Sequence, residues 1–366
     1  MLMFSSMRRG DIDTPALIVD VKVLKRNITE MADFARSLGK KLRPHVKTHK
    51  TPEIAWMQME AGADGICVQK LGEAEVMAEA GLDDILVSNE VVGVQKMHRL
   101  VKLAEKVKLS VAVDDVENVS ELGRFCRENG VEVGVYVDVD CGMHRTGVPP
   151  EKAWLLAEKV TRTEGVYLVG LMGYEGHAGS PTSREERHKL IEEAVKATLH
   201  AAKLMKNNGI EPGEVSMGSS ATVRVSGRYE GVTELQPGMY VFNDWYLVER
   251  EAATQETCAL HVLTTVMSKT SPERCVVDAG SKAFHLDMGR YPVCVGVEGV
   301  EIYKLSEEHG WVKLSGKAVD KVKLGDRLEF IPYHVCPCVN QFDIMYGLEG
   351  DSVTKIWEIK ARGKVT

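Results

Sequence analysis

The sequence predicts an α/β protein: a (β/α)8 TIM-type barrel followed by a C-terminal domain made mostly of β-strands. Eight short apolar runs rich in valine and isoleucine alternate with longer amphipathic stretches between residues 42 and 242, a pattern typical of parallel strand–helix units. After about residue 250, turns separate the apolar runs and no long helical pattern intervenes, which favours a separate β domain. A doubly wound open sheet is the alternative, but no Gly-x-Gly-x-x-Gly segment follows an early strand to support it.

The predicted barrel strands are short segments in which hydrophobic residues dominate. They cover residues 42–47, 65–68, 84–88, 108–113, 132–139, 167–174, 214–217 and 234–242. Helical patterns lie between them, for example at residues 52–61, 71–80, 116–129, 151–163 and 183–207. Several of these patterns end at a glycine, which takes the left-handed conformation that commonly follows a helix.

One further strand, at residues 14–20, precedes the eight and is followed by a helical pattern at residues 21–38. Because this strand stands before the barrel in the chain, it can pair outside the barrel. We predict a barrel over residues 12–248 and a β domain over residues 249–366, with residues 1–11 packed against the β domain.

The composition is that of an ordinary soluble globular protein, with 366 residues that are 44% hydrophobic and 27% charged. The formal net charge of −7 gives no reason to expect nucleic acid or an anionic membrane as a partner. Residues 1–9 hold too short an apolar stretch for a signal peptide, and no apolar run approaches a membrane span. A cytoplasmic location is therefore expected. The eight cysteines do not suggest a disulfide framework in a chain of this length, so most are expected to be small core residues.

Lys47 lies in the basic segment 42–50, at the expected end of the first barrel strand. The carboxyl ends of barrel strands are where catalytic groups sit. A lysine amine placed there can form an imine with a carbonyl compound or with pyridoxal phosphate. Taken alone, the segment fits a solvated basic loop equally well; its place in the strand pattern favours the catalytic interpretation.

A segment of small residues, Gly218-Ser219-Ser220-Ala221-Thr222, follows the seventh predicted strand. Glycine lets the backbone approach an anion, hydroxyl groups donate hydrogen bonds, and a following helical turn directs amide groups at the anion. Taken alone, such a segment is more often a serine-rich helix cap. Barrel enzymes often bind phosphate after strands seven and eight, so the position favours a phosphate site.

Three further polar residues follow predicted strands but carry little information individually. Arg145 can contact an acidic oxygen of a cofactor or bridge a surface carboxylate. His177 lies in a glycine-rich loop that suits a ligand site, but a hydrogen-bonded structural histidine fits as well. Tyr174 can be a core aromatic residue whose hydroxyl group is satisfied within the protein.

His334 and Cys336, in the predicted β domain, form a possible metal pair. We interpret residues 333–340 as the end of a strand, which would place both side chains on the same face. Imidazole and thiolate together suit zinc, and two protein ligands would leave positions for water or substrate. A chance His-x-Cys is also common, since free cysteines are usually inert core residues. Cys338 follows Pro337, which can redirect the chain, so we leave it out of the predicted pair.

Three ordered segments together resemble the D-threonine aldolase and D-serine dehydratase family. They are Arg43-Pro44-His45-Val46-Lys47-Thr48-His49-Lys50, Gly142-Met143-His144-Arg145-Thr146-Gly147 and His334-Val335-Cys336-Pro337. The resemblance spans most of the chain, and three motifs at this spacing are more specific than any one of them. It implies an alanine-racemase-like fold and the use of pyridoxal phosphate.

The resemblance also implies roles for individual residues. Lys47 would form the imine with the cofactor, Arg145 would lie near its pyridoxal hydroxyl, and Tyr174 would lie beside its ring. The phosphate would be held by Gly218, Ser219, Ser220, Gly238 and Met239. In alanine racemases an arginine of the last strand faces the pyridine nitrogen. Here that position is Gln236, a neutral partner that changes how much negative charge the ring can store and argues against full racemase behaviour.

The family's metal pair falls on His334 and Cys336. Zinc is the favoured ion, with manganese or magnesium as alternatives. Within the family, a carboxylate at the second position resembles the aldolases and a cysteine resembles the dehydratases, so the cysteine favours dehydration. No segment matches the tyrosine that alanine racemases use as their second base.

The expected function is that of a pyridoxal phosphate- and metal-dependent lyase acting on small β-hydroxy-D-amino acids. Cleavage would proceed by dehydration and deamination, or by retro-aldol cleavage with His177 or His45 as the base for the β-hydroxyl group. The alternatives are an amino-acid racemase on the same scaffold, a non-catalytic pyridoxal phosphate-binding protein, and a barrel that binds phosphorylated metabolites without pyridoxal. Relatives of this fold are homodimers, and we expect a homodimer by that analogy alone.

Overall fold

The structure of the protein is a computed structural model that describes residues 7–366. The internal contacts of the chain divide it into two units. We call residues 29–47, 52–238 and 363–366 the parallel unit. The antiparallel unit comprises the described residues up to 28, residues 48–51 and residues 239–362.

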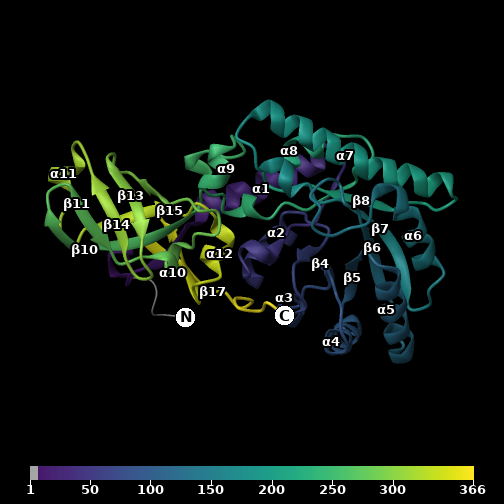
Figure 1. Cartoon of the computed structure of the whole chain (residues 1–366). Coiled ribbons are helices and arrows are strands. Elements are labelled where there is room, and N and C mark those ends of the chain that lie inside the picture. The colour runs from purple at the N-terminus through teal and green to yellow at the C-terminus, as the bar shows by residue number, and fades with distance from the viewer. Residues whose placement is uncertain (1–6) are drawn as a thin grey trace. The chain divides into compact units, whose positions relative to one another are not determined.

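The parallel unit is built on an eight-stranded sheet in the order β2-β9-β8-β7-β6-β5-β4-β3 (Figure 1). Its strands are β2 (Lys41–Leu42), β3 (Ile66–Val68), β4 (Asp84–Glu90), β5 (Lys108–Val113), β6 (Val133–Asp138), β7 (Val166–Met172), β8 (Glu214–Met217) and β9 (Glu234–Leu235). All neighbouring strands pair in parallel. A parallel bridge between His45 and Cys67 joins the segment after β2 to β3. The sheet therefore returns on itself, and the predicted barrel is confirmed.

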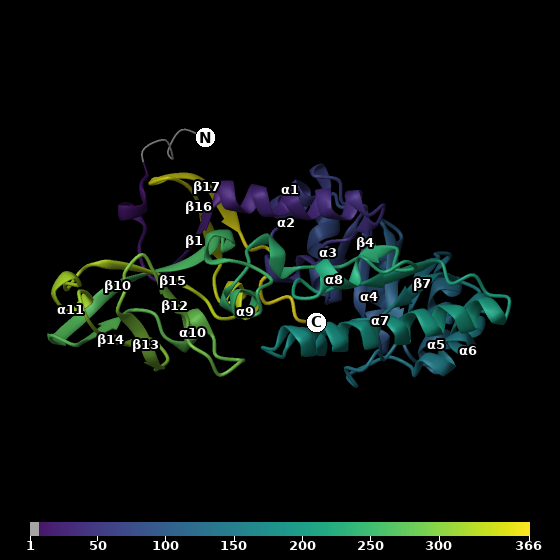
Figure 2. The same ribbon diagram turned by 90° about the horizontal axis from the view of Figure 1, so that it is seen from above.

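A helix follows each of the first seven barrel strands. These helices are α2 (Pro52–Glu60), α3 (Leu71–Glu79), α4 (Val94–Ala104), α5 (Val116–Asn129), α6 (Ala153–Thr161), α7 (Arg184–Asn207) and α8 (Val223–Ser226). In Figure 2 the long helix α7 runs beside α6. Helix α5 shows why the sequence forms these elements: Asp115 accepts hydrogen bonds from the backbone of Glu117 and Asn118, and Gly130 ends the helix at φ 68°.

The barrel interior is packed with one side chain from each of five neighbouring strands. This cluster consists of Cys67, Leu86, Ala112, Tyr136 and Met172, all almost fully buried. Layers of this kind fill parallel barrels, so the interior is a core and the ligand-binding surface must lie at the strand ends.

The antiparallel unit holds a nine-stranded sheet in the order β11-β14-β13-β12-β15-β10-β1-β16-β17. Its strands are β1 (Ala16–Asp20), β10 (Leu260–Ser271), β11 (Arg274–Val277), β12 (Val293–Val295), β13 (Val300–Leu305), β14 (Gly310–Leu314), β15 (Arg327–Ile331), β16 (Ile344–Glu349) and β17 (Ser352–Glu358). Short helices α9 (Trp245–Glu249), α10 (Ser281–Phe284), α11 (Ala318–Lys321) and α12 (Val335–Val339) connect some of these strands, and α1 (Val21–Ser37) follows β1. The predicted fold class, a parallel barrel followed by a mostly β domain, is thus confirmed.

The two structural units do not coincide with the predicted domains, which placed the barrel over residues 12–248. Strand β1 pairs antiparallel with β10 and parallel with β16, so it belongs to the antiparallel sheet although it precedes the barrel. Residues after Met239 also belong to this unit, because the backbone of Trp245 and Tyr246 bonds to residues 332 and 333. Residues 7–11 lie against β17, where the Arg9 amide donates to Asp351 O at 2.9 Å. Residues 1–6, which were expected in the same place, lie outside the described residues.

Two predicted strands are reduced to two residues each in the structure. The run at 42–47 ends as a strand at Leu42 and continues into the 3-10 turn η2 (Val46–Thr48). The run at 234–242 is a strand only over Glu234–Leu235, after which η5 (Met239–Val241) forms. Pro237 explains the second break, because proline has no amide hydrogen to continue a ladder.

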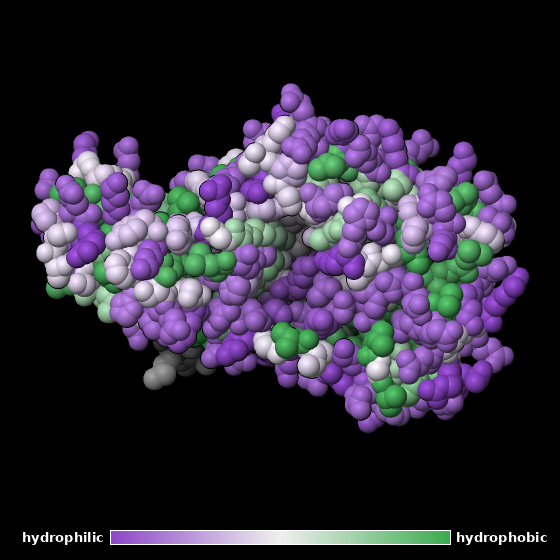
Figure 3. Space-filling view, in the orientation of Figure 1, coloured by the Kyte–Doolittle hydropathy of each residue, from purple (hydrophilic) through white to green (hydrophobic). Residues whose placement is uncertain are grey.

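The state of the cysteines and the polarity of the surface are those expected from the composition. All eight cysteines are free. Figure 3 shows a largely hydrophilic face with small, scattered apolar patches. In residues 7–366, the helices are all too short or too polar to cross a membrane.

Candidate active site

Lys47 lies at the carboxyl end of the barrel strands, where η2 turns the chain away after β2. Its Nζ is 3.4 Å from Oε1 of Gln69, which follows β3, and 5.7 Å from the centre of the Tyr174 ring, which follows β7. The amine is half-buried. A lysine that contacts a neutral amide and an aromatic ring suits covalent chemistry with a carbonyl group.

Tyr174 brings Arg145 to the same place. The Arg145 guanidinium carbon is 5.1 Å from the centre of the Tyr174 ring, within the range of a cation–π contact. Gly176 permits this ring position, since a Cβ on Gly176 would lie only 2.4 Å from Cε1 of Tyr174. Three predicted site residues from the ends of different strands thus meet around one aromatic ring.

The loop after β8, Gly218-Ser219-Ser220-Ala221-Thr222, is held by a buried carboxylate that the sequence analysis missed. Oε2 of Glu175 accepts from the Gly218 amide at 3.1 Å, and Oε1 accepts from the Thr222 hydroxyl at 2.8 Å. The Ser219 amide donates to the Thr222 hydroxyl oxygen at 2.9 Å. Glu175 is fully buried, so its hydrogen bonds to the loop are shielded from water. In the sequence, the position of Glu175 next to Tyr174 was the only indication that this carboxylate belongs to the site.

The remaining predicted phosphate-binding residues follow β9, the neighbour of β8 in the sheet. Gly238 ends the parallel unit, and Met239 begins η5 in the antiparallel unit. The His45 amide donates to Pro237 O at 3.0 Å, which holds this segment beside the end of β2.

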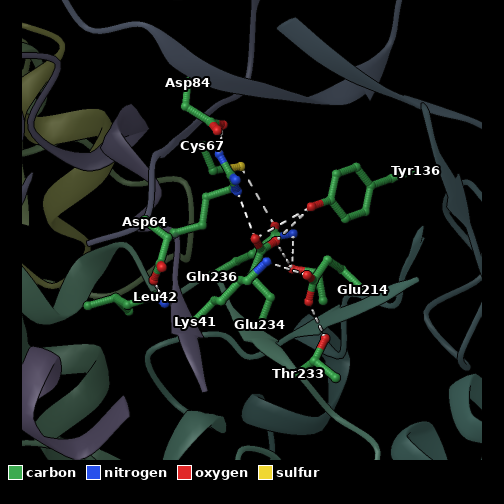
Figure 4. Close-up of polar contacts among 12 residues, drawn as sticks. Lys41, Leu42, Asp64, Cys67, Asp84, Tyr136, Glu214, Thr233, Glu234 and Gln236 are labelled. Carbon is green, nitrogen blue, oxygen red and sulfur yellow. Dashed lines mark hydrogen bonds and ion pairs between the residues drawn. The ribbon is translucent and has the colours of Figure 1, made fainter. Parts of the chain in front are cut away.

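A buried polar chain fixes Gln236 (Figure 4). Nε of Arg43 donates to Oε2 of Glu234 at 2.9 Å, and the Ser216 hydroxyl donates to Oε1 of Glu234 at 2.7 Å. Nε2 of Gln236 then donates to the Ser216 oxygen at 2.5 Å. A carboxylate only accepts, so the single Ser216 proton points to Glu234 and Ser216 can only accept from Gln236.

The amide orientation of Gln236 follows from this chain. Its NH2 group faces Ser216, and its carbonyl oxygen faces the other way, 3.7 Å from Sγ of Cys67. The Cys67 thiol donates to this oxygen, which as an amide oxygen has a second lone pair for another donor.

The two histidines considered as bases differ in their hydrogen bonding. Nε2 of His45 lies 3.2 Å from Oε1 of Gln69 and 3.1 Å from the Ser88 hydroxyl. His177, in η4 (Gly176–Gly179), has a buried Nδ1 with no hydrogen-bond partner among residues 7–366. Burial lowers the pKa of His177. A pKa below the usual range of histidine means that His177 is mostly neutral at pH 7, the state that a general base requires.

Two carboxylates that the sequence analysis did not identify hold the segment carrying Arg145. The Thr146 hydroxyl donates to Oδ2 of Asp138 at 2.8 Å, and the Gly147 amide donates to Oδ2 of Asp114 at 3.1 Å. Burial, followed by the neighbouring Glu90, raises the pKa of Asp138 to about 7. Burial also raises the pKa of Glu90.

Replacing Asp138 with asparagine is expected to stabilise the protein above neutral pH. The raised pKa means that the folded state favours protonated Asp138, so its contribution to stability is complete below pH 3.8 and is lost as the pH rises through about 7. Asparagine still accepts from Thr146 and does not ionise. At about 1.4 kcal/mol per pKa unit, the gain of Asp138→Asn over wild type should grow by about 2–3 kcal/mol between pH 5 and pH 8. Denaturant unfolding at both pH values measures it, with Asp83→Asn at an exposed position as control. A gain that does not change with pH would contradict the assignment.

The predicted metal pair lies in the antiparallel unit, but not on a strand. His334 is the N-cap of α12 and Cys336 is in its first turn, so the prediction of a strand at 333–340 was wrong. Pro337 is tolerated there because the first turn of a helix needs no internal amide donor. Cys338 points elsewhere: it is fully buried and its Sγ donates to Ala283 O at 3.2 Å.

The side chains of His334 and Cys336 interact with each other, and each has a further polar partner. Nδ1 of His334 is 2.5 Å from Oδ2 of Asp287, and Sγ of Cys336 is 3.3 Å from the Thr48 hydroxyl. Within residues 7–366, no three or more His, Cys, Asp and Glu side chains are arranged to hold an ion. An imidazole and a thiol in contact fit a zinc-type ion that takes its remaining ligands from water or substrate.

Comparison with known proteins places this geometry in context. The model of the alanine racemase N-terminal domain matches residues 19–244, and that of a putative serine dehydratase domain matches residues 259–348. A D-threonine aldolase of Arthrobacter sp. is 36% identical over 96% of this chain and 93% of its own length. A D-threo-3-hydroxyaspartate dehydratase of Delftia sp. (strain HT23) is 30% identical over 95% of this chain and 97% of its own length. The crystal structure of D-threonine aldolase from Filomicrobium marinum superposes with a TM-score of 0.94 at 35% identity, covering 98% of each chain.

Proposed function

The chain belongs to the family of D-threonine aldolases and D-serine dehydratases, with a barrel of the alanine racemase N-terminal type, and from that premise we propose that it is a pyridoxal phosphate- and metal-dependent lyase of β-hydroxy-D-amino acids. The predicted family and the lyase class agree with the relatives, which include aldolases and dehydratases. The observation that supports the proposal most is the meeting of Lys47, Arg145 and Tyr174 at the strand ends.

The residues present fit the cofactor that the family implies. Lys47 would hold it covalently, Arg145 would face its phenolic oxygen, and Tyr174 would lie beside its ring. Gln236 would face the pyridine nitrogen. Its carbonyl oxygen already accepts from the Cys67 thiol, and its second lone pair suits a ring nitrogen that carries a proton. The phosphate would be held by Gly218, Ser219, Ser220, Gly238 and Met239. When bound, pyridoxal phosphate withdraws electrons from the substrate bond that the protein aligns with its ring.

The protein's own groups would supply the proton transfers. The amine of Lys47 would take the proton from Cα of the substrate for dehydration. For retro-aldol cleavage, His177 would take the proton of the β-hydroxyl group. Burial lowers the pKa of this imidazole, which supports a neutral base at this position. His334 and Cys336 would hold a divalent ion, zinc first and manganese or magnesium as alternatives, whose chemistry is to polarise an oxygen ligand. We also propose a homodimer in the cytoplasm.

An assay of products tests the function. Purified protein with D-serine, D-threonine and D-3-hydroxyaspartate is expected to yield a 2-oxo acid and ammonia if Cys336 marks a dehydratase. Glycine and an aldehyde would assign the retro-aldol route within the same lyase class. Loss of optical activity without ammonia or aldehyde would contradict the proposal and indicate a racemase. If none of the three substrates reacts, the result would favour a non-catalytic cofactor-binding protein.

A further inference from the structure

We propose that Asp287 is a positioning residue of the metal pair, because its carboxylate holds Nδ1 of His334 and thereby directs Nε2 towards the ion. This inference rests on the proposed function, since it requires that His334 and Cys336 bind a divalent metal. It assigns a role to a residue outside the three segments that the family resemblance involves.

Asp287 is well placed for this role. Its Oδ2 is 2.5 Å from Nδ1 of His334, although the two residues are 47 positions apart in the chain. The Asp287 amide donates to Nδ1 of His285 at 3.1 Å, which ties the aspartate to its own loop. The side chain of His334 is only 19% exposed, so its ring cannot turn freely.

The tautomer of His334 follows from this contact. A neutral imidazole carries one N–H group, and a carboxylate can only accept. Asp287 therefore keeps the hydrogen on Nδ1, which leaves the lone pair on Nε2. Because Asp287 occupies Nδ1, Nε2 is the ring nitrogen left for a further ligand. Cys336 lies two residues further along, in the first turn of the same helix.

The second ligand is held in a comparable way. Sγ of Cys336 lies 3.3 Å from the hydroxyl group of Thr48. When the sulfur is a thiolate, Thr48 is the donor. Outer partners of this kind orient metal ligands, and removing one typically weakens metal affinity about 10–100-fold.

The helix that carries both ligands does not depend on Asp287. Asp244 is fully buried, and its two oxygens accept from the amides of Leu247 and Val335, which fixes the start of α12. Replacing Asp287 should therefore leave the backbone of the pair in place. A simple surface ion pair between Asp287 and His334 would behave differently, since its loss would affect stability alone.

Metal titration of the full-length protein with its cofactor tests the inference. After chelation, Zn²⁺ and Mn²⁺ would be titrated calorimetrically into wild type, Asp287→Asn, Asp287→Glu and His334→Ala. We expect Asp287→Asn to bind Zn²⁺ about 10–100-fold more weakly with an unchanged melting temperature. Asp287→Glu, which restores the carboxylate, should recover most of the affinity. Asp320→Asn on α11 is the matched control in the same unit and should bind like wild type.

The outcomes separate this inference from the function on which it rests. If His334→Ala loses the ion but Asp287→Asn binds as tightly as wild type, Asp287 has no positioning role and the metal pair stands. If wild type binds no ion, or His334→Ala binds like wild type, the metal pair itself is wrong and the inference falls with it. With Co²⁺ as probe, a shift of the visible d–d bands in Asp287→Asn would support the changed ligand geometry, and identical bands would oppose it.

Discussion

Replacing Lys47 with alanine is expected to remove the visible absorbance of protein-bound pyridoxal phosphate and to abolish turnover. The amine is the group that we propose binds the coenzyme covalently, and it is also the proposed acceptor of the Cα proton. Loss of a general base alone lowers a rate by about 10²–10⁴-fold, and loss of the covalent attachment adds to this. Absorbance spectra of dialysed protein and an assay of 2-oxo acid or aldehyde formation measure both effects.

A second lysine provides the control for this experiment. Lys70 follows β3, the strand beside β2, and Lys70→Ala should keep both the absorbance and the activity. Borohydride reduction of wild type followed by peptide mapping should find the coenzyme on Lys47. Coenzyme attached to another residue, or full absorbance in Lys47→Ala, would show that the assignment is wrong.

The fold could be predicted because it depends on local patterns. The alternation of short apolar runs and amphipathic helices marked all eight barrel strands, and counting them placed Lys47, Tyr174 and Gly218 at strand ends. The structure brings Lys47 and Tyr174 together because parallel strands present their carboxyl ends on one edge. Where proline interrupts a local pattern, the predictions failed: Pro237 shortens the last strand, and Pro337 allows a helix where a strand was expected.

The supporting groups could not be predicted because their partners are remote in the sequence. Glu175 is 43 positions from Gly218, and Asp287 is 47 positions from His334. Nothing in the local composition distinguishes these carboxylates from solvated ones. The place of β1 in the antiparallel sheet could not be predicted for the same reason. Its partner strand β10 is more than 240 residues away, as the pairing of Ala16 with Leu263 shows.

Replacing Glu234 with glutamine is expected to destabilise the protein by about 3 kcal/mol, the effect of breaking a buried charge pair. Arg43, Ser216 and Tyr136 all donate to the Glu234 carboxylate, which is fully buried. Glutamine has the same shape, but its NH2 group must face one of these three donors. Arg43 keeps Asp84 as a second partner at 2.6 Å, so the cost should be near the lower end for a buried pair. Denaturant unfolding of the two proteins measures the difference.

The neighbouring strand offers a matched control. Glu214 on β8 pairs with Lys41, whose side chain is 51% exposed, so Glu214→Gln should cost less than about 1 kcal/mol. Equal effects of the two substitutions would show that the buried chain contributes no more than an exposed pair.

The same substitution should also reach the cofactor through Gln236. Glu234 and Gln236 are two residues apart in extended backbone, so their side chains point to the same side. Both side chains form a hydrogen bond with the Ser216 hydroxyl group. Without the carboxylate, the Ser216 proton is no longer committed to Glu234, and the amide of Gln236 loses its fixed orientation. Glu234→Gln is therefore expected to change the absorbance maximum of bound pyridoxal phosphate, whereas Glu214→Gln is not. An unchanged spectrum in Glu234→Gln would mean that contacts other than Glu234 orient Gln236. The buried chain inside the barrel would then stabilise the fold without affecting the polarity of the cofactor site.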